Sequence, residues 1–217
     1  MLKLDRVTFS YGSYKALDGI SFEGDAGSCI VTAGPNGSGK STLLSIISGA
    51  RRAQSGTVEV GGRVGFVPQG TALLEDISVA DNVKFFASVC GKRAPSLTEL
   101  PFQLEELSRR RVSSLSVGMK KRVSIACALA SAPDILVLDE PCASLDILYR
   151  EELLELIRSL KEKGMLIVYA GHDFNEISMI CDKMLLLKDG KAVFYKEKNR
   201  LPANPLELEE LVRKSLH

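Results

Sequence analysis

The sequence predicts an α/β fold with a mostly parallel sheet, an N-terminal antiparallel β subdomain and a small helical insertion. Three observations carry this prediction. The N-terminal segments alternate apolar and polar residues between glycine-containing turns, as half-buried antiparallel strands do. Short, continuous apolar runs follow, as in parallel strands covered on both faces. Between Gln69 and Leu115 the strand pattern stops and helical spacing replaces it.

The composition describes an ordinary globular chain. Its 217 residues are 45% hydrophobic and 25% charged, with a net charge of +1, enough for one domain with a sizeable core. This balance argues against nucleic-acid binding, and the basic run 120–122 is expected to be a solvated helix face. Five scattered cysteines without CxxC spacing indicate reduced thiols. No apolar run approaches membrane-spanning length, so we expect the protein to reach a membrane only through a partner.

The elements follow in order along the chain. Three antiparallel strands are expected in segments 2–11, 16–24 and 56–62, and core strands in the apolar runs 28–34, 65–69, 135–140 and 166–173. Ser78 can cap a first helix of the insertion, and the Ser96/Glu99 capping-box spacing predicts a second. A helix at 151–163, a hairpin turning at Asp189-Gly190 and a terminal helix from Pro205 complete the chain. We expect one domain, 1–217, with a helical subdomain at about 71–132.

A glycine-rich stretch, GPNGSGKS, fits G-x-x-x-x-G-K-[ST] at every fixed position. An apolar strand precedes it and a helical pattern follows, the context in which backbone N–H groups converge on phosphate. Lys40 would reach the β- and γ-phosphates, and the Ser41 hydroxyl would ligate Mg²⁺. The core is therefore expected to be of the P-loop NTPase type. The predicted nucleotide-binding residues of this loop are Gly34, Pro35, Asn36, Gly37, Ser38, Gly39, Lys40, Ser41 and Thr42.

Two adjacent acids, Asp139 and Glu140, end the apolar run ILVL. Parallel strands deliver such residues to the carboxyl edge of the sheet, where α/β proteins bind ligands. Asp139 can hold the hydration shell of Mg²⁺, and Glu140 can orient and deprotonate an attacking water. Simple capping charges are the alternative, disfavoured by the phosphate loop upstream.

With these motifs the chain resembles the nucleotide-binding domain of an ABC transporter over nearly its whole length. The resemblance implies that Tyr11 stacks on adenine, that Gln69 is the Q-loop glutamine, which contacts the metal and water, and that His172 is the switch histidine. The segment 144–146 matches the D-loop. The segment LSVGM stands at the signature position, usually LSGGQ.

In the family the signature of one copy covers the phosphate bound by another. That role needs a helix N-terminus, a hydroxyl and close backbone approach, and Ser116 and Gly118 supply the last two. Val117 and Met119 depart from the usual motif, but the phosphate donors remain, so we interpret LSVGM as a working variant. Followed by basic residues, it also resembles the signature of bacterial exporters.

The resemblance therefore implies an ATPase subunit using ATP and Mg²⁺, with Glu140, His172, Gln69 and Lys40 catalytic and the metal held by Ser41, Gln69 and Asp139. Its expected partners are a separate transmembrane permease subunit and a second ATPase subunit, as homodimer or heterodimer, at the cytoplasmic face of the membrane. The alternatives are a soluble ABC-type assembly or scaffold switch, an inactive regulatory subunit and, remotely, a small-molecule kinase. Cargo and the choice between ATP and GTP stay open.

Overall fold

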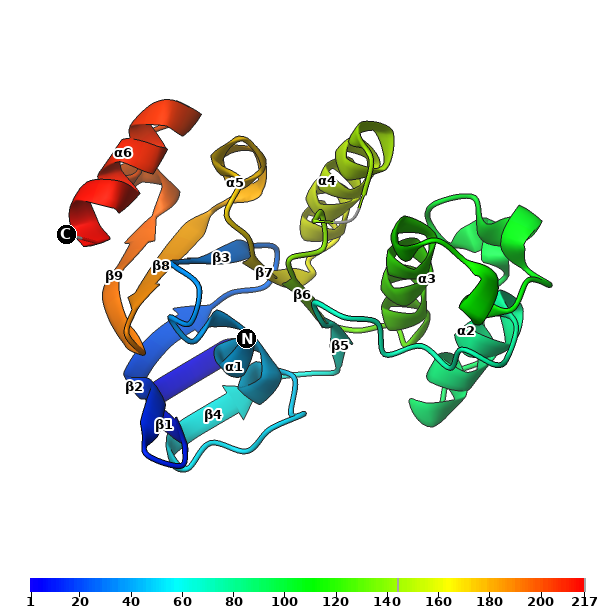
Figure 1. The fold of residues 1–217 in the computed structure, drawn as a ribbon, viewed down its shortest axis with the longest axis horizontal. Helices are drawn as coiled ribbons and strands as arrows, with labels where there is room; N and C mark the ends of the chain where they lie inside the picture. Colours follow the sequence, from blue (N-terminus) through cyan, green and yellow to red (C-terminus); the bar gives the residue numbers. More distant parts are fainter. Residues whose placement is uncertain (144, 217) are drawn as a thin grey trace.

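The computed structural model describes residues 1–143 and 145–216. The molecule contains two sheets, helices packed against them and a separate lateral group of helices (Figure 1). The larger sheet has the order β5-β6-β7-β3-β8-β9, parallel throughout except for the antiparallel pair β8 and β9. The predicted mostly parallel core is thus confirmed. The strands of this sheet are β3 (Cys29–Ala33), β5 (Val64–Val67), β6 (Ile135–Asp139), β7 (Leu166–Ala170), β8 (Lys183–Lys188) and β9 (Lys191–Glu197).

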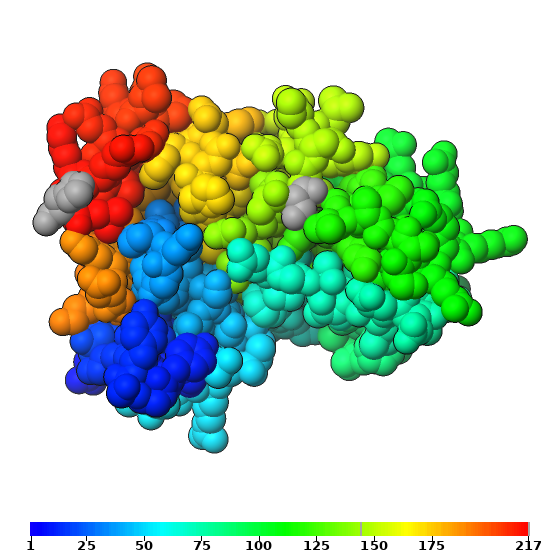
Figure 2. Space-filling view, in the orientation of Figure 1, coloured from blue at the N-terminus to red at the C-terminus, as the bar shows by residue number. Residues whose placement is uncertain are grey.

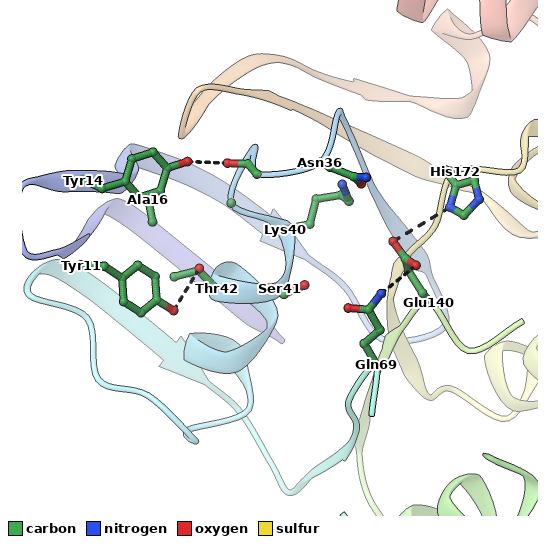
Figure 3. A pocket seen from close by; sticks show the side chains of 12 residues that line it. Tyr11, Tyr14, Ala16, Asn36, Lys40, Ser41, Thr42, Gln69, Glu140 and His172 are labelled. Atoms are coloured by element: carbon green, nitrogen blue, oxygen red, sulfur yellow. Dashed lines mark hydrogen bonds and ion pairs between the residues drawn. The ribbon is translucent and has the colours of Figure 1, made fainter. Parts of the chain in front are cut away.

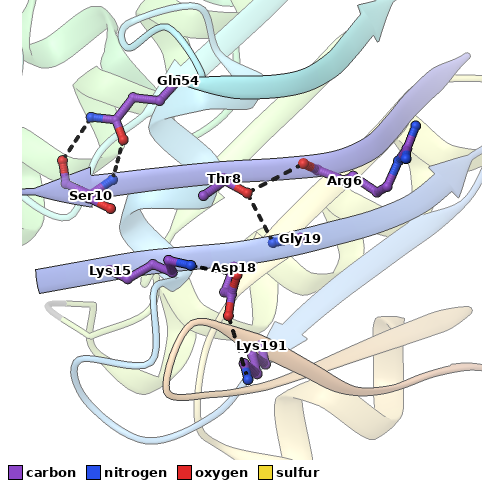
Figure 4. Close-up of polar contacts among 8 residues, drawn as sticks. All are labelled: Arg6, Thr8, Ser10, Lys15, Asp18, Gly19, Gln54 and Lys191. Carbon is purple, nitrogen blue, oxygen red and sulfur yellow. Dashed lines mark hydrogen bonds and ion pairs between the residues drawn. The ribbon is translucent and has the colours of Figure 1, made fainter.

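The predicted N-terminal antiparallel sheet has the order β2-β1-β4, formed by β1 (Leu2–Tyr11), β2 (Tyr14–Gly24) and β4 (Ser55–Val60). Strand β1 is irregular at Arg6, which adopts φ 49°, and its register with β2 shifts there. Beyond the bulge the Gln54 side chain accepts from Ser10 N at 2.8 Å and donates to Ser10 O at 3.0 Å (Figure 4). This paired contact fixes the end of β1 and therefore the backbone that carries Tyr11.

The helical insertion (residues 71–132) forms a lobe beside the sheets (Figure 2). It consists of α2 (Val79–Val89), α3 (Val117–Ala130) and the single 3₁₀ turns Leu97–Glu99, Leu104–Leu107 and Val112–Ser114. Ser78 caps α2 by accepting from Asp81 N at 3.1 Å, as predicted. The prediction of a helix after Ser96 is wrong, because the chain forms only the 3₁₀ turn Leu97–Glu99 there. Pro101 lacks the N–H that would continue it, and the two residues that follow have positive φ.

The remaining helices are α1 (Lys40–Ile47), α4 (Ile147–Glu162), α5 (Phe174–Ile180) and α6 (Pro205–Leu216). Helix α4 begins before the predicted Glu151 because Asp146 accepts from Tyr149 N at 3.2 Å and caps it. The hairpin turn at Asp189-Gly190 and the start of α6 at Pro205 lie where the sequence predicted them. No helix within residues 1–143 and 145–216 combines the length and apolar character needed to cross a membrane.

Two apolar clusters pack on opposite faces of the larger sheet, because successive strand residues point to opposite faces. In β6, Val137 joins the cluster with α1, whereas Leu136 and Leu138 join the cluster with α3 and α4. The second cluster also contains the apolar side chains of the insertion. Cysteines 29, 127, 142 and 181 are buried and Cys90 is exposed, all with free thiols.

The expectation of a solvated basic face at 120–122 is wrong. Lys121 is 2% and Arg122 8% exposed. The Arg122 guanidinium lies 3.7 Å from the centre of the Tyr149 ring, so α4 covers it. The hydrophobic pattern of α3 does not indicate the burial of these two side chains, because nearly every side of the helix is buried.

Candidate nucleotide-binding site

The glycine-rich loop joins the buried strand β3 to α1 and is packed against two other strands. Gly34 has φ 144°, and a Cβ there would lie 2.2 Å from the carbonyl oxygen of Leu187 in β8. Gly39 has φ 106°, and its Cβ would lie 2.4 Å from the Ala16 carbonyl oxygen in β2. Both positions therefore require glycine, and the loop path is set by neighbouring backbone as well as by its own sequence.

Lys40 is the buried cation of this loop. It is 7% exposed, and its ammonium donates to the Gly34 carbonyl at 2.8 Å and the Pro35 carbonyl at 3.0 Å. Burial lowers its pKa, while the nearby carboxylates of Glu140 and Asp139 act in the opposite direction. The loop thus surrounds a positive centre, which suits phosphate oxygens.

A cavity of about 560 Å³ opens over the loop (Figure 3). It lies at the carboxyl edge of the larger sheet, where the order of strands brings β3, β6 and β7 together. The residues that line it are Tyr11, Tyr14, Ala16, Asn36, Gly37, Gly39, Lys40, Ser41, Thr42, Gln69, Glu140 and His172. Most of the residues expected to contact nucleotide therefore share one cavity.

Glu140 stands at the centre of the polar end of this cavity. The Gln69 amide donates to Glu140 Oε2 at 3.2 Å, and His172 Nδ1 lies 3.9 Å from Oε1 (Figure 3). Glu140 has φ 47°, an unfavourable value for a residue with a side chain. Its N–H donates to the Ala170 carbonyl at 2.9 Å, which holds the strained residue at the end of β6. The arrangement places one carboxylate between an amide and an imidazole, directly beside the phosphate loop.

Asp139 is the last residue of β6, directly before Glu140 of the cavity lining, and is 3% exposed. Burial raises its pKa, and the adjacent Ser41 hydroxyl partly opposes that shift. Among residues 1–143 and 145–216, no group forms a hydrogen bond with its buried Oδ1. A buried carboxylate oxygen with a free lone pair next to a hydroxyl is the donor chemistry that Mg²⁺ prefers. The residues present therefore fit the metal.

Two aromatic residues line the other end of the cavity. Tyr11 is 46% exposed and its hydroxyl lies 3.4 Å from Thr42 Oγ1. The Arg51 guanidinium lies 4.9 Å from the centre of the Tyr11 ring. The Tyr14 hydroxyl donates to the Gly37 carbonyl at 2.6 Å. Sequence reasoning missed Tyr14 and Arg51. The closeness of Tyr14 to Tyr11 in the sequence could have suggested that both lie at the cavity. Nothing in the sequence placed Arg51 beside Tyr11.

Ser116 and Gly118 are not among the residues that line the cavity. Ser116 is exposed and caps α3 by accepting from Met119 N at 3.3 Å, as predicted, and Gly118 lies in the first turn. Asp146 caps α4, while Ser144, the first residue of the predicted D-loop, lies outside the described residues. Within one copy, the predicted signature thus forms a separate surface from the phosphate loop.

Comparison with known proteins identifies the family to which this chain belongs. The sequence model of the ABC transporter family matches residues 17–143, which contain the phosphate loop, Gln69, the LSVGM segment and the acidic pair. The chain belongs to the ABC transporter family. This family membership confirms the resemblance inferred from the motifs and identifies the chain as an ATP-binding subunit with ATPase activity.

Several curated ABC proteins are similar along most of this chain. An uncharacterized ABC transporter ATP-binding protein, MJ1023 of Methanocaldococcus jannaschii, is 34% identical over 89% of the chain and 76% of its own length. The linearmycin resistance ATP-binding protein LnrL of Bacillus subtilis is 32% identical over 89% and 68%. The sulfate/thiosulfate import ATP-binding protein CysA of Vibrio cholerae is 36% identical over 88% and 56%. Both a resistance protein and an importer subunit are therefore relatives.

A solved ABC structure shares the fold. It is a dimeric ATP-binding cassette in a post-hydrolysis state bound to ADP and Pi, 26% identical, with a TM-score of 0.77 over 91% of this chain and 98% of that one. The α/β P-loop fold of the ABC ATPases is thereby confirmed for this chain.

Proposed function

We propose that the chain powers transport, in the export direction, through a separate transmembrane permease subunit, by ATP-driven closure of two ATPase subunits. One observation carries the proposal. Within one copy, Ser116 is not among the residues that line the cavity over the Lys40 loop. A second copy in head-to-tail arrangement would bring the two together. The dimeric relative with ADP and Pi supports the dimer, and the exporter-like LSVGMKKR segment supports the direction.

The residues of the cavity have the chemistry for hydrolysis. Glu140 would accept a proton from water while orienting it towards the γ-phosphate. Lys40 and His172 would stabilise charge on the phosphate oxygens, and Gln69 would hold Glu140 and the water in place. Ser41, Asp139 and Gln69 would hold Mg²⁺, which when bound neutralises phosphate charge.

Nucleotide binding would use the remaining surfaces. The loop N–H groups would bind the phosphates, and Tyr11 would stack on the base. Ser116 and Gly118 of the second copy would cover the γ-phosphate. We propose that residues 1–217 act as one ATPase domain, with residues 71–132 as its helical subdomain, peripheral to the membrane through the permease.

Light scattering of Glu140→Gln, with and without Mg·ATP, tests the dimer. Loss of the water-activating carboxylate should trap the closed state, and the mass should double with ATP. Ser116→Arg in the same background should abolish the doubling, while Ser88→Arg, at an exposed serine of α2, should not. A mass that stays monomeric in the presence of co-expressed permease as well would contradict the proposal.

Transport direction needs a separate experiment. The permease that co-purifies with the chain should be reconstituted in vesicles with ATP on the side of the ATPase subunit. Net movement of cargo away from that side is expected for an exporter. Movement towards it would contradict the export assignment and leave the ATPase assignment intact.

A further inference from the structure

Lys121 is buried beneath the loop that carries Gln69. It is 2% exposed, and its ammonium donates to the Pro68 carbonyl at 2.8 Å and the Gln69 carbonyl at 2.9 Å. Lys121 belongs to α3 in the helical insertion, whereas these two carbonyls directly follow β5 of the larger sheet. One side chain thus connects the two parts of the molecule at the polar end of the nucleotide cavity.

The surroundings of Lys121 keep a buried charge acceptable. Burial lowers its pKa, and the carboxylates of Asp139 and Glu140 act in the opposite direction. A buried ammonium without such partners would be strongly unfavourable. The same two carboxylates are those assigned to the metal and to the attacking water, so they favour the charged form of Lys121 in addition to the two carbonyls that accept its hydrogen bonds.

A continuous series of contacts leads from α3 to the reacting groups. Ser116 caps the N-terminus of α3, and Lys121 extends from the following turn of the same helix. Lys121 holds the backbone carbonyl of Gln69, whose side-chain amide donates to Glu140 Oε2 at 3.2 Å. A shift of α3 relative to the sheet would therefore change the placement of the amide against the carboxylate.

The other end of the Gln69 loop is held by further contacts, one from α2 and one from α3. Asn82 bonds both the N–H and the carbonyl of Leu74 at 2.9 Å, and Lys120 lies 2.7 Å from the Glu75 carboxylate. Between these anchors, residues 70–72 are exposed and in neither helix nor strand. A Cβ at Gly70 would meet no atom of the described residues within 4 Å. The intervening segment can change shape while Gln69 stays fixed to α3.

We propose that Lys121 is a positioning residue of the ATPase site, fixing the Gln69 backbone to α3 so that the position of the signature helix sets the contact between Gln69 and Glu140. The inference rests on the proposed roles of those two residues. Lys121 would thus act on the ATPase site of its own copy, whereas Ser116 of the same segment would act on the nucleotide of the second copy.

Steady-state ATPase kinetics of Lys121→Met test the proposal, with Lys161→Met as the matched control. Lys161 is another largely buried lysine, with a side chain 15% exposed that donates to the Ile180 carbonyl at 2.9 Å, and it is not among the residues that line the nucleotide cavity. Lys121→Met should lower kcat about 10- to 100-fold, with KM changed by less than about threefold, because a catalytic group is displaced while the groups that bind ATP stay in place. Lys161→Met should lose thermal stability while its kcat is retained.

A double-mutant cycle separates positioning from a general structural effect. In the Lys121→Met background, Gln69→Ala should lower kcat little further, because both changes disrupt the same contact. Tyr11→Ala should change KM by the same factor in the wild type and in Lys121→Met. Full additivity of Lys121→Met with Gln69→Ala, or an equal kcat loss in Lys161→Met, would overturn the proposal.

Hydrogen exchange of the protein without nucleotide provides a readout that does not depend on hydrolysis. Amides at the end of β5 (residues 65–67), which precede the anchored carbonyls and pair with β6, should exchange faster in Lys121→Met than in the wild type or Lys161→Met. Unchanged exchange would overturn the role of Lys121 even if the wild type hydrolyses ATP. A wild type without ATPase activity, alone or with its permease, would instead refute the proposed function, and faster exchange would still support the anchor.

Discussion

Replacing Gly34 by alanine should destabilise the protein much more than the same change at Gly37. Both glycines have positive φ, 144° and 80°, and both lie in the phosphate loop. Within the described part of the chain, a Cβ at Gly37 meets only the Tyr14 hydroxyl, at 3.9 Å. A Cβ at Gly34 lies 2.2 Å from the Leu187 carbonyl oxygen and 2.8 Å from Ser38 Oγ. The two variants therefore share backbone strain and differ in steric conflict.

The magnitudes follow from these contacts. Positive φ costs about 1–2 kcal/mol for a residue with a Cβ, and the lower entropy of the unfolded alanine chain restores about 0.4–1 kcal/mol. We therefore expect a loss of about 1 kcal/mol for Gly37→Ala. At Gly34 the carbonyl belongs to a core strand that cannot move freely, and overpacking adds about 1–3 kcal/mol. The expected loss is about 2–4 kcal/mol, a large part of the stability of a typical domain.

Urea unfolding without nucleotide, followed by circular dichroism, measures the difference. The midpoint urea concentration should fall more for Gly34→Ala than for Gly37→Ala. The slope of the unfolding free energy against urea concentration should be unchanged in both variants. Equal midpoints would refute the reasoning, because they would mean that β8 moves away from the loop without loss of stability.

Three further predictions concern polar contacts. Tyr14→Phe removes the bond to the Gly37 carbonyl, and equilibrium binding should show ATP affinity reduced about two- to fivefold; unchanged affinity would count against a role in shaping the loop. Burial raises the pKa of Asp139 above its ordinary 3.8, so its stabilising contribution is complete below that value and is lost as the pH rises through the folded pKa. The Tm of the wild type should thus fall relative to that of Asp139→Asn as the pH rises above about 4, whereas a constant difference would contradict the shift. Arg150→Met leaves the buried Glu176 carboxylate, 3.3 Å from Arg150 Nε, without its cation; unfolding should show a loss of about 2 kcal/mol, largely recovered by adding Glu176→Gln, and no recovery would contradict this cause.

Much of the fold could be predicted because its signals are local. The strand, glycine-rich loop and helix around Lys40 are contiguous in sequence, and the caps Ser78 and Ser116 are recognised by spacing alone. Phosphate binding depends on such contiguous backbone, so most of the predicted cavity residues could be named without coordinates.

The errors and omissions involve contacts between distant segments. The burial of Lys121 depends on carbonyls at Pro68 and Gln69, more than fifty positions upstream, so the local basic run indicated the wrong environment. The position of Arg51 against Tyr11 likewise requires the turn after α1 to meet β1. Hydrophobic periodicity contains no information about such polar contacts across a fold.

The distribution of thiols has a practical consequence for spectroscopy. Burial raises the pKa of Cys127, Cys142 and Cys181 to about 12 and that of Cys29 well above its ordinary value, so these four will react slowly with maleimides. Cys90 is exposed at the C-terminal cap of α2, on the helical insertion. A fluorophore or spin label should therefore attach at this one native position, and a distance measured from it to a second label on the sheet would report insertion movement during nucleotide turnover without removal of any cysteine.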